Sequence, residues 1–181
     1  PYTESDTPNP KSVYGATKLA GERHVRTNAP RHLIVRTAWT FGPGRNNFIV
    51  KVLERAHRQG KLDVVRDQVG SPTWTADLAR GIIALVLSGA RGLFHVANSG
   101  SCSRFDLAKA ALEKAGMGKV PVNPIETKAY VHPEGASSAP RPAYSVLDTS
   151  AFTAKTGIVL PRWKDALNAY LDSGEAGWPP E

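Results

Sequence analysis

Short, largely apolar runs along this chain predict its strands. Residues 32–39, HLIVRTAW, form such a run and end at the turn FGPG of residues 41–44. Continuity, in contrast to alternation, indicates a strand that is buried on both faces. Shorter runs at residues 62–65 and 92–96 predict two further strands, and residues 120–125 are a weaker candidate.

Helical patterns fill the segments between these runs. A first helix is expected to begin after Pro10 and to run to about Asn28, since prolines punctuate both of its ends. Thr75 and Ser103 are the expected N-caps of two later helices. Helices are expected over residues 47–58, 75–87, 103–115, 149–156 and 162–171. The alternation of helices and strands predicts an α/β fold.

Two segments carry no regular pattern. Residues 66–74 read as a polar loop, and residues 126–143, rich in Pro, Ser and Ala, read as a long loop that can cover a site as a lid.

Composition narrows the class of protein. The 181 residues are 41% hydrophobic and 22% charged, as in an ordinary globular protein, and contain no apolar run of the 18 residues that a membrane helix needs. The single cysteine, Cys102, excludes an intrachain disulfide and a zinc cluster and fits a cytoplasmic location. The formal charge of +7 is not arranged in basic runs with interleaved aromatic residues. We therefore expect a phosphorylated small ligand and no nucleic acid.

Tyr14 and Lys18 carry the candidate chemistry. They lie four residues apart in the first predicted helix, so both side chains project from one face. A neighbouring ammonium stabilises a phenolate and makes a tyrosine a better proton donor near neutrality. This suits the reduction of a carbonyl, in which a hydride reaches carbon while an acid protonates oxygen. The same spacing is also common on solvated helix surfaces.

Four motifs in order give the chain a resemblance. They are YGATK at residues 14–18, VRTAWTFGPG followed by NNF at residues 35–48, DQVGSPTW at residues 67–74 and RPAYSVLD at residues 141–148. Together they resemble the dTDP-4-dehydrorhamnose reductases of the extended short-chain dehydrogenase/reductase superfamily, from residue 1 to about residue 171. The resemblance implies the second half of a Rossmann-like parallel sheet plus a small α/β substrate-binding domain. Residues 1–45 and 75–100 would belong to the first, residues 46–74 and 101–173 to the second, and residues 174–181 would be a flexible tail.

The resemblance also implies an activity, in which NADPH or NADH reduces dTDP-4-dehydro-6-deoxy-L-mannose to dTDP-L-rhamnose. Tyr14 would protonate the sugar C4 oxygen, and Lys18 would acidify Tyr14 and hydrogen-bond the nicotinamide ribose. Thr37 and Phe41 would complete the cofactor site, and no metal site is expected. The substrate-binding residues would be Trp39, Asn47, Gln68, Ser71, Thr73 and Arg141.

Reasons for these assignments come from the residues themselves. Thr37 and Trp39 lie at the carboxyl end of a parallel strand, where open α/β sheets bind ligands. Arg141 stands between two prolines, and a guanidinium can grip a pyrophosphate through paired hydrogen bonds.

One family element is missing from the sequence. Gly116 and Gly118 follow a helix instead of opening one, so no Gly-x-x-Gly-x-x-Gly turn is present for a dinucleotide. The chain is therefore expected to be a C-terminal portion, weak or inactive alone, that self-associates or contacts the N-terminal half. Two alternatives stay open: a non-catalytic sugar-nucleotide-binding or regulatory subunit of the same fold, and a sugar-nucleotide epimerase.

Overall fold

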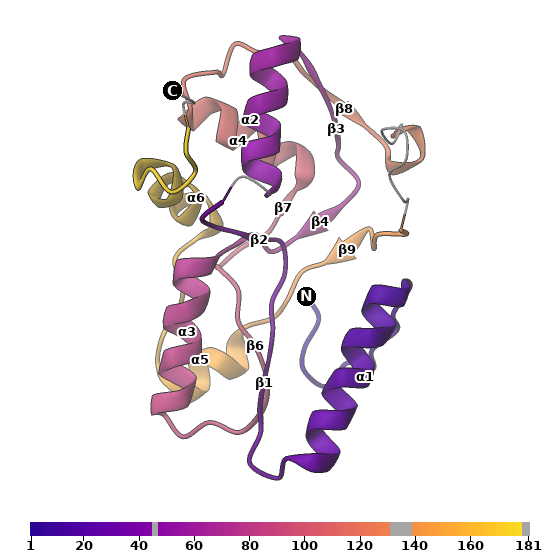
Figure 1. The fold of residues 1–181 in the computed structure, drawn as a ribbon, viewed down its shortest axis with the longest axis vertical. Helices are drawn as coiled ribbons and strands as arrows, with labels where there is room; N and C mark the ends of the chain where they lie inside the picture. Colours follow the sequence, from indigo (N-terminus) through magenta and orange to yellow (C-terminus); the bar gives the residue numbers. More distant parts are fainter. Residues whose placement is uncertain (45–46, 131–138, 179–181) are drawn as a thin grey trace.

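Helices and strands alternate along the chain in two groups that lie one above the other in Figure 1. The computed structural model describes residues 1–44, 47–130 and 139–178. The helices are α1 (Val13–Asn28), α2 (Phe48–Gln59), α3 (Thr75–Leu87), α4 (Arg104–Lys114), α5 (Ser150–Thr156) and α6 (Trp163–Asp172), with a 3-10 turn η1 (Thr127–Ala129). The strands are β1 (Leu33–Arg36), β2 (Thr40–Phe41), β3 (Leu62–Val65), β4 (Val69–Gly70), β5 (Thr73–Trp74), β6 (Gly92–His95), β7 (Cys102–Ser103), β8 (Val122–Ile125) and β9 (Tyr144–Ser145). The predicted α/β class with parallel strand pairs is confirmed.

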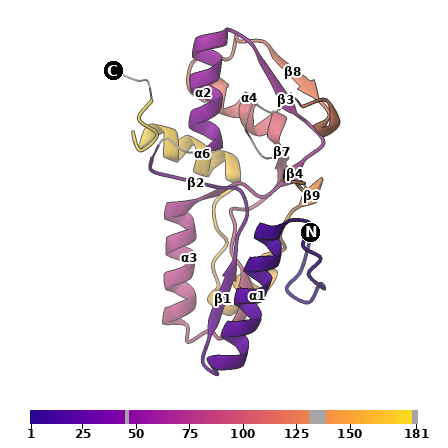
Figure 2. The ribbon, with the colours of Figure 1, turned by 45° about the vertical axis from the view of Figure 1, so that its right-hand side comes forward.

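The lower group is built on a parallel pair, β1 and β6, in which Leu33 lies opposite Gly92. Helices α3 and α1 lie on opposite sides of this pair in both views (Figures 1 and 2). On the α3 side, Val96 and Phe152 are fully buried, and Gly81 lets α3 approach them closely. On the other side, α1 contributes no buried residue. For this reason β1 is only half-buried along its length, and the expected burial on both of its faces is wrong.

The upper group packs α2, α4 and α6 around one core beside the parallel pair β3–β8. Helix α2 has a strong apolar stripe, and Leu53 on that stripe is fully buried. Leu112, Leu167 and Tyr170 fill the same core.

Local signals place several helix ends. The hydroxyl of Ser103 accepts from the N–H of Asp106 and caps α4, and the carboxylate of Asp106 accepts from the N–H of Ser103. This capping box confirms the predicted cap. Thr75, in contrast, is the first residue of α3 and not its cap. The cap position is Trp74, because strand β5 runs directly into the helix.

Short strands join the two groups. Strand β4 pairs with β7 in antiparallel fashion and with β9 in parallel fashion, and β2 pairs with β5. Residues 66–74, expected to be a loop, thus contain two strands of two residues each. The predicted lid lies partly outside the described residues, at positions 131–138.

Part of the segment expected to be a flexible tail, residues 174–181, packs against the fold in its described portion up to residue 178. Ala176 is buried, and the ring of Trp178 meets the ring of His57 with centroids 5.9 Å apart. Burial of a large indole surface explains this packing.

None of the helices in the described ranges has the length and apolarity that crossing a bilayer requires.

Candidate functional site

Tyr14 and Lys18 lie together on the exposed face of α1. The ammonium of Lys18 is 5.5 Å from the centroid of the Tyr14 ring, a cation–π distance. Tyr14 is 71% exposed. Within the described part of the chain, neither its hydroxyl nor the ammonium of Lys18 has a hydrogen-bond partner. Both groups are therefore free to meet a ligand.

An ion pair between β1 and α1 sets the position of Tyr14 and Lys18 along the direction of β1. Arg36, at the end of β1, donates two hydrogen bonds to the carboxylate of Glu22, at 2.7 and 2.6 Å. From Glu22 back to Tyr14 the helix rises about 12 Å, and from Arg36 on to Trp39 the chain extends about 10 Å. Because α1 and β1 run in opposite directions, the amino end of α1, which carries Tyr14, and the carboxyl end of β1 lie at the same end of this strand pair (Figures 1 and 2).

A buried polar atom marks the carboxyl end of β1. The hydroxyl oxygen of Thr37 is buried and has no hydrogen-bond partner among the described residues. Buried polar groups are nearly always hydrogen-bonded, so this hydroxyl, at the strand end where open α/β sheets bind ligands, has hydrogen-bonding capacity for a bound group. The Nε2 of His95, at the end of the neighbouring strand β6, likewise has no partner among the described residues.

Trp39 is held in an unusual conformation beside this strand end. Its φ of 45° places a bulky residue in the left-handed region, which is uncommon for any residue except glycine. The carbonyl of Trp39 accepts a hydrogen bond from the backbone N–H of Thr73 at 3.3 Å. The indole lies so close to Gly70 that a Cβ there would fall 2.7 Å from Nε1. Backbone strain of this kind persists only where the surroundings enforce it, and it gathers at functional sites.

Arg104, which sequence reasoning missed, packs against the same indole. Its guanidinium carbon lies 3.8 Å from the Trp39 ring centroid and 4.8 Å from that of Phe48. Burial, and next the charge of Arg141, lowers the pKa of Arg104 to about 10. The pairing of β7 and β9 with the two edges of β4 places the segment of Arg141 beside that of Arg104. The sequence held one signal that could have pointed to Arg104: it is a cation in the first turn of α4, where a positive charge opposes the helix dipole.

A shallow concavity of about 290 Å³ follows β2. Residues 40–44, Asn47 and Thr75 line it. The ring of Phe41 points into the core, with its centroid 5.3 Å from that of Tyr170. Tyr14 and Lys18 line neither this concavity nor a second one of about 620 Å³, which is lined largely by residues 146–150.

Asn47 uses its side chain within the protein. Its Oδ1 accepts from the N–H of Val50 and caps α2, while its Nδ2 donates to the carbonyls of Gly42 and Gly44 and to the Tyr170 hydroxyl. These bonds hold the turn of residues 42–44 against α2 and α6. The geometry thus favours a structural role for this residue.

Gln68, Ser71 and Thr73 are buried and likewise engaged within the chain. The Gln68 amide donates to the Thr127 hydroxyl at 3.1 Å. The Ser71 hydroxyl accepts from the N–H of Leu147, and the Thr73 hydroxyl donates to the carbonyl of Ser71. These contacts tie residues 68–73 to the segments that carry Arg141 and η1.

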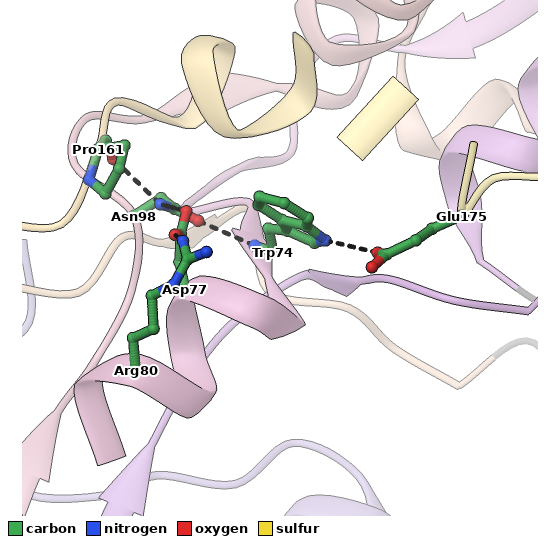
Figure 3. Close-up of polar contacts among 6 residues, drawn as sticks. All are labelled: Trp74, Asp77, Arg80, Asn98, Pro161 and Glu175. Carbon is green, nitrogen blue, oxygen red and sulfur yellow. Dashed lines mark hydrogen bonds and ion pairs between the residues drawn. The ribbon is translucent and has the colours of Figure 1, made fainter. Parts of the chain in front are cut away.

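Figure 3 shows a buried polar network that joins the end of β5, the first turn of α3 and the segments of Asn98 and Pro161. Asn98 donates to the carboxylate of Asp77 at 2.7 Å and to the carbonyl of Pro161, and accepts from the N–H of Trp74 at 2.9 Å. Asp77 and Asn98 are only 1% and 2% exposed. Arg80 and Glu175 extend the network at its two ends. Because its polar groups are mutually satisfied, the network positions β5 and α3 instead of offering reactive groups.

Parallel strand pairs with helices packed beside them define a Rossmann-like α/β protein, a class in which ligands bind at the carboxyl ends of the strands. Within that class, the chain belongs to the family described as the RmlD substrate binding domain, which matches residues 1–175. The resemblance drawn from four motifs is therefore confirmed.

Curated relatives agree with this assignment. The chain is 41% identical over 170 residues to the dTDP-4-dehydrorhamnose reductase of Mycolicibacterium smegmatis, an alignment that covers 92% of this chain and 50% of that protein. It is 40% identical over 171 residues to the spore coat polysaccharide biosynthesis protein SpsK of Bacillus subtilis, covering 94% and 58%.

Solved structures match the fold closely. The dTDP-4-dehydrorhamnose reductase of Clostridium acetobutylicum has a TM-score of 0.88 at 40% identity, covering 96% of this chain and 59% of that one. The Bacillus anthracis enzyme, solved in complex with NADP, has a TM-score of 0.87 at 34% identity, covering 95% and 59%. The chain thus spans between one half and three fifths of the length of these relatives.

Proposed function

We propose that this chain is the part of an NAD(P)H-dependent dTDP-4-dehydrorhamnose reductase that donates the proton and binds the sugar nucleotide. The reaction would convert dTDP-4-dehydro-6-deoxy-L-mannose to dTDP-L-rhamnose. The observation that carries the proposal is the unsatisfied Tyr14–Lys18 pair, on the helix whose amino end lies at the same end of the strand pair as the carboxyl end of β1, in a chain of this family.

Tyr14 acts as the general acid. Its hydroxyl donates a proton to the C4 oxygen of the keto sugar, and the cation of Lys18 stabilises the phenolate that remains. The exposure of both side chains gives a substrate access to them.

The chain's groups fit a nicotinamide nucleotide. The hydroxyl of Thr37 lacks a partner, and the ammonium of Lys18 has donors to spare for a ribose. Phe41 would contribute through its main chain, since its ring is in the core. Bound NADPH or NADH would supply the hydride.

Trp39 and Arg141 suit the sugar nucleotide directly, the indole by packing on a ring and the guanidinium by pairing with phosphate oxygens. Asn47, Gln68, Ser71 and Thr73 would act by shaping the turn and loop beside the substrate, since their hydrogen bonds are made within the chain.

The division into a nucleotide-binding part and a substrate-binding part remains a proposal. Two separate apolar clusters support it, although Phe152 and Leu160 join the cluster of β1, β6 and α3. By itself the chain should bind a dTDP-sugar weakly and turn it over slowly. Its exposed apolar side chains on α1 and α3 favour self-association or contact with another polypeptide segment.

The test is consumption of NADPH with the keto sugar, by this polypeptide and by the product of the whole reading frame that encodes it. We expect little turnover by the polypeptide and formation of dTDP-L-rhamnose by the product of the whole frame. Tyr14→Phe should lower kcat by about 10²–10⁴-fold. Turnover by the polypeptide at an enzyme's usual rate would refute the expected weak activity of this part alone.

Two other outcomes identify the alternatives. Binding of the sugar nucleotide without turnover would identify a non-catalytic or regulatory subunit. A product with inverted sugar stereochemistry and no net NADPH consumption would identify an epimerase.

A further inference from the structure

Arg104 is a half-buried cation whose side-chain N–H donors have no hydrogen-bond partner among the described residues. Its guanidinium stacks on Trp39 and Phe48, and it makes no ion pair within the described part of the chain. A guanidinium has five N–H donors in a fixed plane. When its faces are covered by aromatic rings, the donors on its rim stay available to a ligand in that plane.

The backbone of Arg104 is fixed from both sides. Its N–H donates to the carbonyl of Gln68 at 3.1 Å, and the capping box of Ser103 and Asp106 sets the first turn of α4. The guanidinium is therefore preorganised and not a freely moving surface group. Preorganisation of this kind lowers the entropic cost of binding a ligand.

The charges around Arg104 favour an anion. The segments that carry Arg104 and Arg141 bond to adjacent residues of one segment, since the N–H of Arg104 donates to the carbonyl of Gln68 and the N–H of Val69 donates to the carbonyl of Ala143. The nearby carboxylate of Asp106 is held by Ser103 in the capping box. Two neighbouring guanidinium groups without a counter-ion repel each other unless an anion lies between them. A diphosphate carries enough charge and enough oxygens to accept from both.

We propose that Arg104 is a substrate-binding residue that, together with Arg141, holds the diphosphate of the nucleotide sugar while its stacked plane fixes the indole of Trp39. This inference rests on the proposed function, because it deepens the description of the same site. Arg104 follows β7, which pairs with β4, and β4 pairs with the strand that follows Arg141. Because the proposed function gives Thr37 and Lys18 to the nicotinamide nucleotide, we assign this diphosphate to the sugar nucleotide.

The experiment is titration calorimetry of the whole chain at low ionic strength with dTDP, thymidine, inorganic pyrophosphate and NADPH. Variants are Arg104→Gln, Arg104→Lys and the matched control Arg91→Gln, which removes the same charge from an exposed position. Removing one charge-assisted hydrogen-bonding group should weaken dTDP binding by about 10–100-fold and leave thymidine binding within twofold. Arg104→Lys should lose part of the affinity, and Arg91→Gln should match the unaltered chain. Circular dichroism of each variant reports whether it is folded.

The outcomes separate this inference from the proposed function. If the unaltered chain binds dTDP and Arg104→Gln binds it equally well, the role of Arg104 is refuted and the proposed function stands. Equal losses for dTDP and thymidine would overturn the inference in favour of a purely structural stack on Trp39. A loss confined to NADPH, or pyrophosphate binding as tight as that of dTDP, would also overturn it. If the unaltered chain does not bind dTDP, the inference is refuted for this chain, and the proposed function is then decided separately by turnover of the keto sugar by the product of the whole reading frame.

Discussion

A single methyl group at Gly70 should reveal how tightly Trp39 is held. A Cβ at this position would lie 2.7 Å from Nε1 and 2.8 Å from Cζ2 of the indole, and closer still to Cε2. The indole must therefore move, and it cannot do so without disturbing the guanidinium of Arg104, 3.8 Å from its centroid. Overpacking of this kind costs about 1–3 kcal/mol. The φ of Gly70 is not positive, so alanine adds no backbone strain of its own.

Urea unfolding followed by far-ultraviolet circular dichroism measures the change in the free energy of unfolding, with the m-value as a check on the two-state assumption. Gly21→Ala is the matched control, because Gly21 lies inside α1 with open space around it. That variant should stabilise the chain by about 0.5–1 kcal/mol through helix propensity.

A double-mutant cycle makes the reasoning refutable. In a Trp39→Ala background the methyl group at position 70 has room, so its cost should fall below about 0.5 kcal/mol. If Gly70→Ala leaves the stability unchanged, or costs the same with and without the indole, then the indole is not packed against Gly70 as described.

Three further changes test other contacts. Hydrogen bonds from Arg36 lower the pKa of Glu22, so the pair stabilises the fold above the unfolded pKa of about 4.3, and this contribution disappears as the pH falls through the folded value. Glu22→Gln should therefore cost about 1–2 kcal/mol in urea unfolding at pH 7 and nearly nothing at pH 3, and a cost that does not vary with pH would contradict the pairing. Asn98→Ala leaves several buried groups without partners and should cost about 3–5 kcal/mol in the same assay, whereas Asn123→Ala, at an exposed position, should cost under about 0.5 kcal/mol. Burial raises the pKa of Cys102 to about 12, so its reaction with a disulfide reagent at pH 8 should be about a thousandfold slower than that of a free thiol, and fast labelling of the folded chain would show that the thiol is accessible.

The elements that sequence reasoning predicted well are those specified by neighbouring residues. The capping pair Ser103 and Asp106 lies within one turn, and the stripe of α2 repeats along one helix, so both signals are local. The run at residues 62–65 was placed correctly as β3 for the same reason. The prediction of Thr75 as a cap was wrong because β5 leads directly into α3 and puts Trp74 at the cap position. Strand β5 forms by pairing with β2, which lies more than 30 residues away in the sequence, so no local signal revealed it.

The parts of the site that were missed depend on contacts between distant segments. Strands of two residues, such as β4 and β9, exist only because of their pairing and have no pattern of their own. Asn98 meets Asp77 across 21 residues, and Arg104 meets Trp39 only after α4 has packed on the rest of the fold. Motif matching could select Trp39 and Arg141, but the guanidinium of Arg104 against the Trp39 indole becomes visible only in three dimensions.

The helix that carries Tyr14 and Lys18 is also the element least secured by packing. None of the 16 residues of α1 is buried, and among the described residues the hydrogen bonds that leave this helix run from Arg36 to Glu22. A helix of this length is marginal without tertiary contacts. Val13 and Val25 meanwhile expose apolar surface on it, 82% and 39% respectively. The position of Tyr14 relative to β1 therefore depends on one ion pair and on whatever surface covers α1. Weak activity of the chain by itself would then follow from a poorly held acid, in addition to any lack of cofactor contacts. Amide hydrogen exchange would decide this point: we expect α1 to exchange far faster than α2 and α4, and equal protection of all three helices would show that the pair is already held in place.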